Sequence, residues 1–291
     1  MNAVTEPHHP YYIPRPSPYP IILSAALFLL GLGAALGVNG LTAGRWALGL
    51  GALLLAYVLF RWFGAVIGES RAGLYGAQED RAFRWGMLWF ITSEVVFFAS
   101  LFGVLFYERN IAVPWLASFN AAHTSWAPFS PWPHFTAQWP NSGPAGARFQ
   151  VVDPWGIPAL NTLLLLSSGV TVTWAHAAVR AGRRTQLKAG LLLTIALGLT
   201  FLGFQVREFA EAYRQLGLTL HSGVYGATFF ILTGFHGLHV TVGTIMLSAV
   251  LARAWRGEFT PEHHFAFEAV SWYWHFVDVV WLALFVFVYW L

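Results

Sequence analysis

Seven long apolar runs constrain the fold of this chain more than any other feature. They cover 21–38, 46–67, 83–107, 157–179, 188–209, 223–251 and 267–291. Each is about as long as a helix must be to cross a hydrocarbon core of roughly 30 Å at a rise of about 1.5 Å per residue. Only 10% of the 291 residues are charged, whereas soluble domains average roughly 25%. The sequence therefore predicts an all-α, polytopic membrane protein with seven transmembrane helices.

The helices are expected to form a two-helix plus five-helix arrangement. The first two runs should make a helical hairpin over 21–67, because Asn39 and Gly40 supply the chemistry of a tight turn between them. The other five runs should form a bundle over 83–291. The remaining segments are expected outside the bilayer: an N-terminal arm (1–20), a loop (68–82) and a Pro- and Trp-rich loop (110–156). The last of these lacks a helical period, and irregular backbone cannot face lipid.

The basic residues predict which ends of the helices are cytoplasmic. Eleven of the 16 Lys and Arg residues lie on the side of the N-terminus: Arg15, Arg61, Arg71, Arg81, Arg84, Arg180, Arg183, Arg184, Lys188, Arg253 and Arg256. The other five are Arg45, Arg109, Arg148, Arg207 and Arg214. Because cytoplasmic loops carry the excess of positive charge, the N-terminus and the 68–82 loop should be cytoplasmic, and the C-terminus and the 110–156 loop external. No clustered basic face predicts a nucleic-acid partner.

The last run carries a polar stripe. Glu268, Ser271, His275 and Asp278 fall within about 80° of one another on a helical wheel. An ionisable group that faces lipid costs at least a few kcal/mol, so the stripe should face other helices, water or a partner subunit. Two interpretations stay open, a structural polar core and a direct role in proton or ligand traffic.

Glu94 lies near the middle of the third run, with no basic residue within a helical turn. Burial disfavours the charged form of a carboxyl group, so we expect Glu94 to be protonated. As a structural group it would hydrogen-bond to a neighbouring helix, at Asn161 or Ser168. As a functional group it would exchange protons, and both interpretations stay open.

The histidines do not indicate a redox centre. His236 and His239 lie on similar faces of the sixth run, and a metal site with His275 is conceivable, but membrane histidines more often hydrogen-bond across helices. The other candidates lie at helix ends or in connections: His176, His221, His263 and His264. With no cysteine in the chain, thiolate sites are excluded. We therefore expect no metal, no haem and no catalytic residue in this chain.

Small residues on the sixth run predict a closely packed interior helix. Thr233, Gly237 and Thr241 are spaced by four residues, and Gly226 and Gly234 narrow the same helix elsewhere. Such spacing lets a neighbouring backbone approach.

Three motifs in order carry a resemblance to a known family. The runs FEAVSWYWHFVDVVW (267–281), VYGATFFILTGFHGLHV (224–240) and NTLLLLSSGVTVTWAH (161–176) resemble subunit III of the haem-copper cytochrome c oxidases, bacterial type. The motifs PSPYP (16–20), SEVVFF (93–98) and HHF (263–265) extend the resemblance over nearly the whole chain. One departure is Ala177, where the family pattern has a second histidine after TWAH.

The resemblance implies a non-redox subunit of a proton-pumping, aa3-type cytochrome c oxidase in the bacterial cytoplasmic membrane. Its partners would be oxidase subunits I and II, which would hold haem a and copper, and cytochrome c would be reached through the complex. An acidic residue within a Ser-Glu-Val motif is characteristic of this family, and in this chain that residue is Glu94. The family also implies phospholipid bound between the first hairpin and the rest, for which Arg61, Trp62 and Arg256 are plausible headgroup contacts.

Two other functions remain as alternatives. Subunit III of a quinol oxidase is the first, although seven helices and the PSPYP start resemble the cytochrome c branch more than the five-helix quinol type. An independent transporter or channel is the second, since the polar stripe and Glu94 alone would permit it. Purification separates the classes, because an oxidase subunit should co-purify with haem-bearing chains.

The charge count generates a topological prediction. Single cysteines introduced as Ala3→Cys and Leu291→Cys would be the only thiols in their chains. An impermeant thiol reagent added outside intact cells should label position 291 and spare position 3. The reverse labelling pattern would contradict the predicted orientation.

Overall fold

The computed structural model describes residues 12–14, 16–118, 135–144 and 148–290. Throughout that part the regular structure is helical. Among the described residues, seven helices are long and apolar enough to cross a membrane, which confirms the predicted fold class. These spans are α1 (Tyr19–Val38), α2 (Ala43–Arg71), α3 with its continuation (Ala77–Ser118), α5 (Ile157–Arg180), α6 (Arg184–Arg214), α7 (Val224–Trp255) and α8 with its continuation (Phe265–Trp290).

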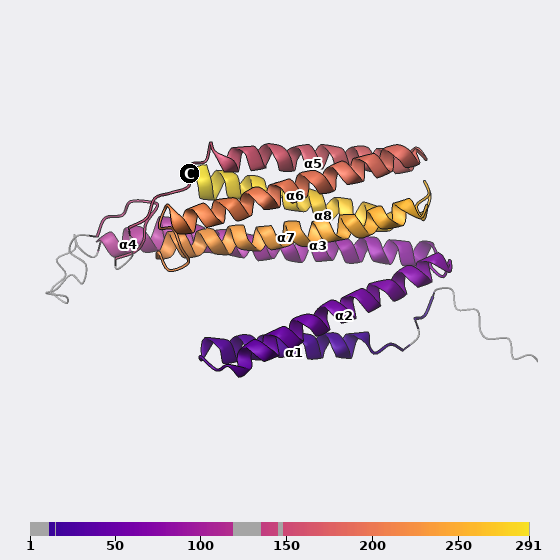
Figure 1. Cartoon of the computed structure of the whole chain (residues 1–291), viewed down its shortest axis with the longest axis horizontal. Coiled ribbons are helices and arrows are strands. Elements are labelled where there is room, and N and C mark those ends of the chain that lie inside the picture. Colours follow the sequence, from indigo (N-terminus) through magenta and orange to yellow (C-terminus); the bar gives the residue numbers. More distant parts are fainter. Residues whose placement is uncertain (1–11, 15, 119–134, 145–147, 291) are drawn as a thin grey trace, which may run out of the picture. The chain divides into compact units, whose positions relative to one another are not determined.

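The chain divides into two compact units, Met1–Trp85 and Gly86–Leu291. In the first unit, α1 and α2 run along each other as a hairpin (Figure 1). Glycine brings their backbones together: a Cβ added at Gly44 would lie 2.5 Å from the backbone nitrogen of Gly37. The turn passes through Gly40, whose φ of 74° suits glycine. Small residues therefore hold this hairpin by close backbone contact.

The predicted 68–82 loop is shorter in the structure. Helix α2 continues to Arg71 and α3 (Ala77–Tyr107) begins at Ala77, so the connection is only 72–76. The early start of α3 has a physical cause, because Glu79 and Asp80 lie in its positively polarised first turn. Arg84 also donates to the Asp80 carboxylate at 2.8 Å. Hydropathy marks the apolar part of a helix, whereas these polar ends extend beyond it.

The short connection is tied to the described part of the N-terminal arm. The Glu79 carboxylate accepts the backbone N–H groups of Tyr12 and Gly76, both at 2.8 Å. The Tyr75 hydroxyl donates to Glu69 at 2.5 Å, and burial together with this carboxylate raises the pKa of Tyr75. The predicted arm ends earlier than residue 20 because α1 begins at Tyr19. Residues 1–11 and 15 of the arm lie outside the described residues.

The predicted 110–156 loop begins later than expected. A π-helical turn (Glu108–Ala112) and α4 (Val113–Ser118) continue α3 without a break. Pro114 is part of the irregular composition that suggested a loop, but it lies inside this continuous helix, two residues after the π-helical turn. Residues 119–134 and 145–147 of this loop lie outside the described residues.

The described parts of the loop pack on the beginning of α7. Trp139 meets the Tyr225 ring edge-on at 5.7 Å, and Phe149 stacks on it at 5.5 Å. The Tyr225 N–H donates to the Asn141 carbonyl at 3.1 Å. Gly223 must be glycine here, because a Cβ would lie 1.7 Å from the Ser142 carbonyl oxygen and φ is 98°.

Helices α5, α6, α7 and α8 form the core of the second unit, with the part of α3 in this unit running beside α7 (Figure 1). Helix α8 (Phe265–Leu284), which ends in a π-helical turn (Phe285–Trp290), contributes Trp274 and Trp281 to the centre of the core, and both are fully buried. Their indole N–H groups donate to Ser168 at 2.8 Å and to Thr162 at 2.9 Å. Buried tryptophan needs such a partner, so these bonds join α8 to α5.

The predicted close approach at the small residues of α7 is wrong at two positions. A Cβ added at Gly234 or Gly237 would meet nothing within 4 Å among the described residues. The tight positions are Gly243 of α7 and Gly198 of α6, where a Cβ would lie 2.9 and 2.7 Å from the Trp274 ring. Sequence spacing shows which residues are small but not which side of the helix receives the tryptophan.

Gly243→Ala should destabilise the bundle, because the added methyl group must displace the fully buried Trp274. Overpacking of this kind costs about 1–3 kcal/mol. The matched control is Gly237→Ala on the same helix, which has open space and should leave stability unchanged or slightly raised. Thermal unfolding of the two variants in the same detergent measures the difference, and equal midpoints would refute this packing role.

Candidate functional site

Glu94 of α3 and His239 of α7 form a close pair. The distance between Glu94 Oε2 and His239 Nε2 is 2.8 Å, and their side chains are 21% and 13% exposed. Both residues belong to apolar helices, so each needs a polar partner in the protein. The pair therefore connects two transmembrane helices through one strong contact.

The hydrogen bonds of the pair define its proton count. The other ring nitrogen of His239, Nδ1, lies 2.6 Å from the Phe235 carbonyl oxygen. A carbonyl can only accept, so Nδ1 carries a hydrogen. A second proton must then lie between Nε2 and Glu94. Without it, a carboxylate would face the lone pair of Nε2, and the two would repel each other. Either a neutral acid donates to a neutral imidazole, or an imidazolium donates to a carboxylate, and both forms are net neutral.

The predicted partners of Glu94 are wrong. The Ser168 hydroxyl donates to the Leu165 carbonyl at 2.6 Å and accepts from Trp274. Asn161 is fully buried, and neither polar atom of its amide has a partner among the described residues. The sequence shows that Glu94 faces the protein, but not which helix lies opposite.

Aromatic rings surround the pair. Phe98 meets the His239 ring edge-on at 5.0 Å, and Phe97 stacks on it at 6.2 Å. The Tyr273 hydroxyl reaches the His239 carbonyl oxygen at 3.4 Å. Apolar walls lower the local dielectric and strengthen the contact between the two side chains.

The polar stripe of α8 faces α5. His275 Nε2 lies 3.1 Å from the Thr173 hydroxyl, and His275 Nδ1 lies 3.5 Å from Asp278 Oδ2. Asp278 packs directly against Gly169, where a Cβ would lie 2.5 Å from Oδ2. Ser271, in the same stripe, is also buried. Of the three surroundings expected for the stripe, which are other helices, water or a partner subunit, His275 and Asp278 therefore have another helix.

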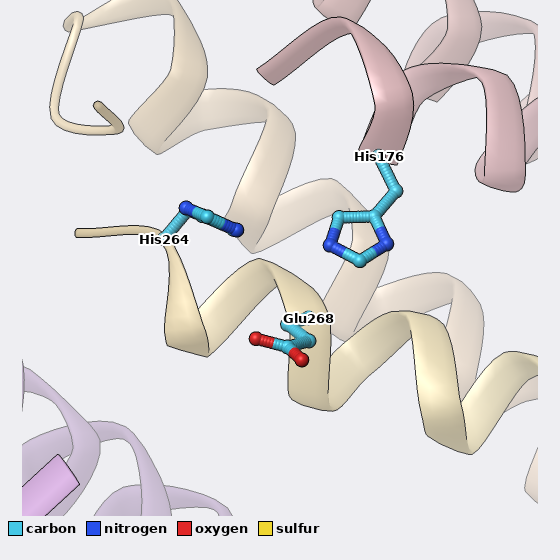
Figure 2. A group of neighbouring side chains, drawn as sticks. All are labelled: His176, His264 and Glu268. Carbon is cyan, nitrogen blue, oxygen red and sulfur yellow. The ribbon is translucent and has the colours of Figure 1, made fainter. Parts of the chain in front are cut away.

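Glu268 begins the stripe and lies beside two histidines. Figure 2 shows His176, from the end of α5, and His264, which precedes α8, turned toward Glu268. One ligand-type atom from each residue lies within 4.8 Å of the others. Nothing in the sequence links these three residues, because their convergence depends on how α5 meets the start of α8.

His236 has a structural position. It is fully buried, and its Nε2 lies 3.2 Å from the Val277 carbonyl oxygen of α8, so it donates across the helix interface. The imagined site of His236, His239 and His275 is not assembled in the described residues, because each ring is directed to a different partner.

The residues predicted to bind lipid lie at helix surfaces and ends. In the first unit Arg61 is exposed, and Trp62 stacks on Tyr19 at 5.9 Å. In the second unit Arg256 is exposed at the C-terminal cap of α7. Their role as headgroup contacts stays a prediction.

A second buried acid, Glu208 of α6, was not predicted from the sequence. It is 2% exposed, and its carboxylate accepts from the Tyr289 hydroxyl at 2.6 Å and from Gln205 at 3.2 Å. The signal was available, because Glu208 stands inside the apolar run 188–209. Its neighbour Arg207 made this part of the run look like a solvated helix end.

These features define a multi-pass membrane protein whose polar side chains pair between helices. Residues 9–291 match the family model described as cytochrome c oxidase subunit III. Curated proteins named cytochrome c oxidase subunit 3 are similar over 97% of this chain: that of Marchantia polymorpha is 42% identical over 283 residues (96% of its length), that of Oncorhynchus mykiss 42% over 285 (97%), and that of Cyprinus carpio 41% over 283 (97%). The chain belongs to the cytochrome c oxidase subunit III family. It is thus a subunit of an oxidoreductase and assembles with other oxidase subunits.

The proton of the Glu94 and His239 pair can be located by chemical modification. We expect it on Glu94, because a neutral pair is favoured over an ion pair in apolar surroundings. A hydrophobic carbodiimide, which attacks protonated carboxyls, should then modify Glu94, as detected by mass spectrometry of peptides. Glu94→Gln is the control and should abolish that modification alone. An unmodified Glu94 beside a modified Glu208 would place the proton on His239.

Proposed function

We propose that this chain is the non-redox subunit III of a proton-pumping, aa3-type cytochrome c oxidase, where it supports assembly, proton uptake and stability during turnover. The pair of Glu94 and His239 carries the proposal. It holds one proton between two helices at 2.8 Å, in a family whose enzyme consumes protons. Such a pair can maintain helix packing and exchange protons slowly without taking part in electron transfer.

The deep histidines support the assignment of haem a and copper to oxidase subunits I and II. Both ring nitrogens of His239 and of His275 face polar partners. His236 has one nitrogen, Nδ1, without a partner among the described residues, but this side chain is fully buried between helices and its Nε2 donates to a backbone carbonyl. Haem ligation needs an imidazole nitrogen free to bind iron. In this arrangement the ligands would come from the partner subunits, and cytochrome c would dock on the complex.

The setting follows from charge and span number. We place the chain in the bacterial cytoplasmic membrane, with its N-terminus in the cytoplasm and its C-terminus in the periplasm. The seven candidate spans among the described residues support ends on opposite sides of the membrane, and the excess of basic residues favours a cytoplasmic N-terminus. Phospholipid headgroups would be bound by Arg61, Trp62 and Arg256.

A quinol oxidase remains the second candidate, since another subunit would select the electron donor. The polar groups of the spans give little support to an independent transporter. Most of them are engaged in contacts within the bundle, and the stripe of α8 packs on α5.

The test of the proposed function is the variant Glu94→Gln in the complete oxidase. The Gln amide can still donate to His239 Nε2, so the complex should assemble. Electron transfer should stay within about twofold of the parent, equivalent to about 0.4 kcal/mol in the barrier. Proton release per electron or the working lifetime should fall. Oxygen consumption and proton release by the same enzyme in vesicles measure both.

Glu94→Ala is the companion variant. It leaves a cavity and an unsatisfied nitrogen on His239, at a cost of about 1–3 kcal/mol, so less complex should assemble. Complete loss of electron transfer in a fully assembled Glu94→Gln oxidase would show a direct catalytic role, and the supporting function would be wrong.

A further inference from the structure

We propose that His176, His264 and Glu268 form a binding site for a divalent transition-metal ion, and that Zn²⁺ is the preferred ion. From the sequence we expect no metal in this chain, and the supporting function proposed above does not require one. The site would join the end of α5 to the residues that begin α8.

The geometry is close to that of a three-ligand metal site. One ligand atom of each residue lies within 4.8 Å of the other two, and Figure 2 shows the three side chains turned toward a common space. In a tetrahedral zinc site with Zn–N distances of about 2.0–2.1 Å, ligand atoms are about 3.3 Å apart. The difference is about 1.5 Å at most, which rotation of partly exposed side chains can supply.

His264 is already oriented as a ligand. Its Nδ1 lies 3.1 Å from the Thr260 carbonyl oxygen, and a carbonyl can only accept, so Nδ1 carries the hydrogen. In a neutral imidazole the lone pair is then on Nε2. Metal-binding histidines typically donate their other ring N–H to a carbonyl or carboxylate, which fixes both the tautomer and the ring orientation.

His176 supplies the second, independent observation. Its Nε2 is buried and has no hydrogen-bond partner among the described residues. A buried polar atom without a partner is costly. In Figure 2 this ring lies beside the His264 ring, and the two ring centroids are 5.7 Å apart. In the tautomer of His176 that carries its hydrogen on Nδ1, a metal ion between the rings would bind the lone pairs of both Nε2 atoms.

The ligand set selects the kind of ion. Two neutral imidazoles and one carboxylate make a site of net charge −1, which attracts a cation. Imidazole suits Zn²⁺, Cu²⁺ and Ni²⁺, whereas Mg²⁺ and Ca²⁺ prefer oxygen ligands. His264 and Glu268 are four residues apart and so lie on one face at the start of α8. Because His176 comes from α5, a bound ion would hold these two helices together.

Metal titration of the full chain in lipid nanodiscs, purified through a tag without histidine, tests the site. His8→Asn and His9→Asn are included in every protein so that the terminal histidines do not contribute. Calorimetry should find one Zn²⁺ per chain, with no competition from excess Mg²⁺ or Ca²⁺. Co²⁺ used as a probe should give the visible absorption of tetrahedral coordination.

Three variants and one control identify the ligands. His176→Asn, His264→Asn and Glu268→Gln should each weaken Zn²⁺ binding by at least about 100-fold, because loss of a partner behind a ligand already costs 10–100-fold. His221→Asn, an exposed histidine outside the cluster, should bind as the parent does. Circular dichroism without metal confirms that each variant is folded.

X-ray absorption of the zinc-loaded parent protein identifies the ligands directly, without any substitution. It should show two imidazole nitrogens and a carboxylate oxygen around the ion. Zinc binding that survives all three substitutions, that is lost equally in His221→Asn, or that shows no histidine ligand would overturn the proposal. Absence of stoichiometric binding by the folded parent chain would do the same.

Discussion

The joint between α5 and α8 depends on one constraint of the bilayer, that a polar atom in a span must find its partner within the protein. Along this joint four residues of α8 meet residues of α5. The pairs are Trp281 with Thr162, Asp278 beside Gly169, Trp274 with Ser168, and His275 with Thr173. Because these pairs occur turn after turn, the register of α8 on α5 is specified by chemistry as well as by shape.

The rest of the core is arranged around that joint. The hydrogen bond to Ser168 fixes the position of the Trp274 ring. The facing helices, α6 and α7, therefore need small residues where they contact the ring. These residues are Gly198 of α6 and Gly243 of α7, each with no room for a methyl group toward the ring. The hydrogen bond and the two glycines therefore act together: the bond to Ser168 sets the position of the Trp274 ring, and the glycines leave room for it.

The sequence was sufficient for the number of spans and for the polar face of the last helix, because both follow from hydrophobicity and the helical period. It was insufficient wherever two distant helices meet. The period shows that Glu94 points inward, but His239 is identified only by the approach of α7 to α3. His176, His264 and Glu268 converge for the same reason, from segments nearly 90 residues apart. The positions of the helix ends beyond the apolar runs were also not predicted, because hydropathy does not detect helical turns made of polar residues.

The neutrality of the Glu94 and His239 pair has a consequence for a site in a medium of low dielectric. A lone carboxyl that released its proton there would leave a charge whose solvation energy the surroundings cannot supply. Transfer from Glu94 to His239 instead moves the proton within one hydrogen bond and changes the local dipole while the net charge stays at zero. The two forms of the pair therefore carry the same net charge, and neither requires its surroundings to solvate an added ion.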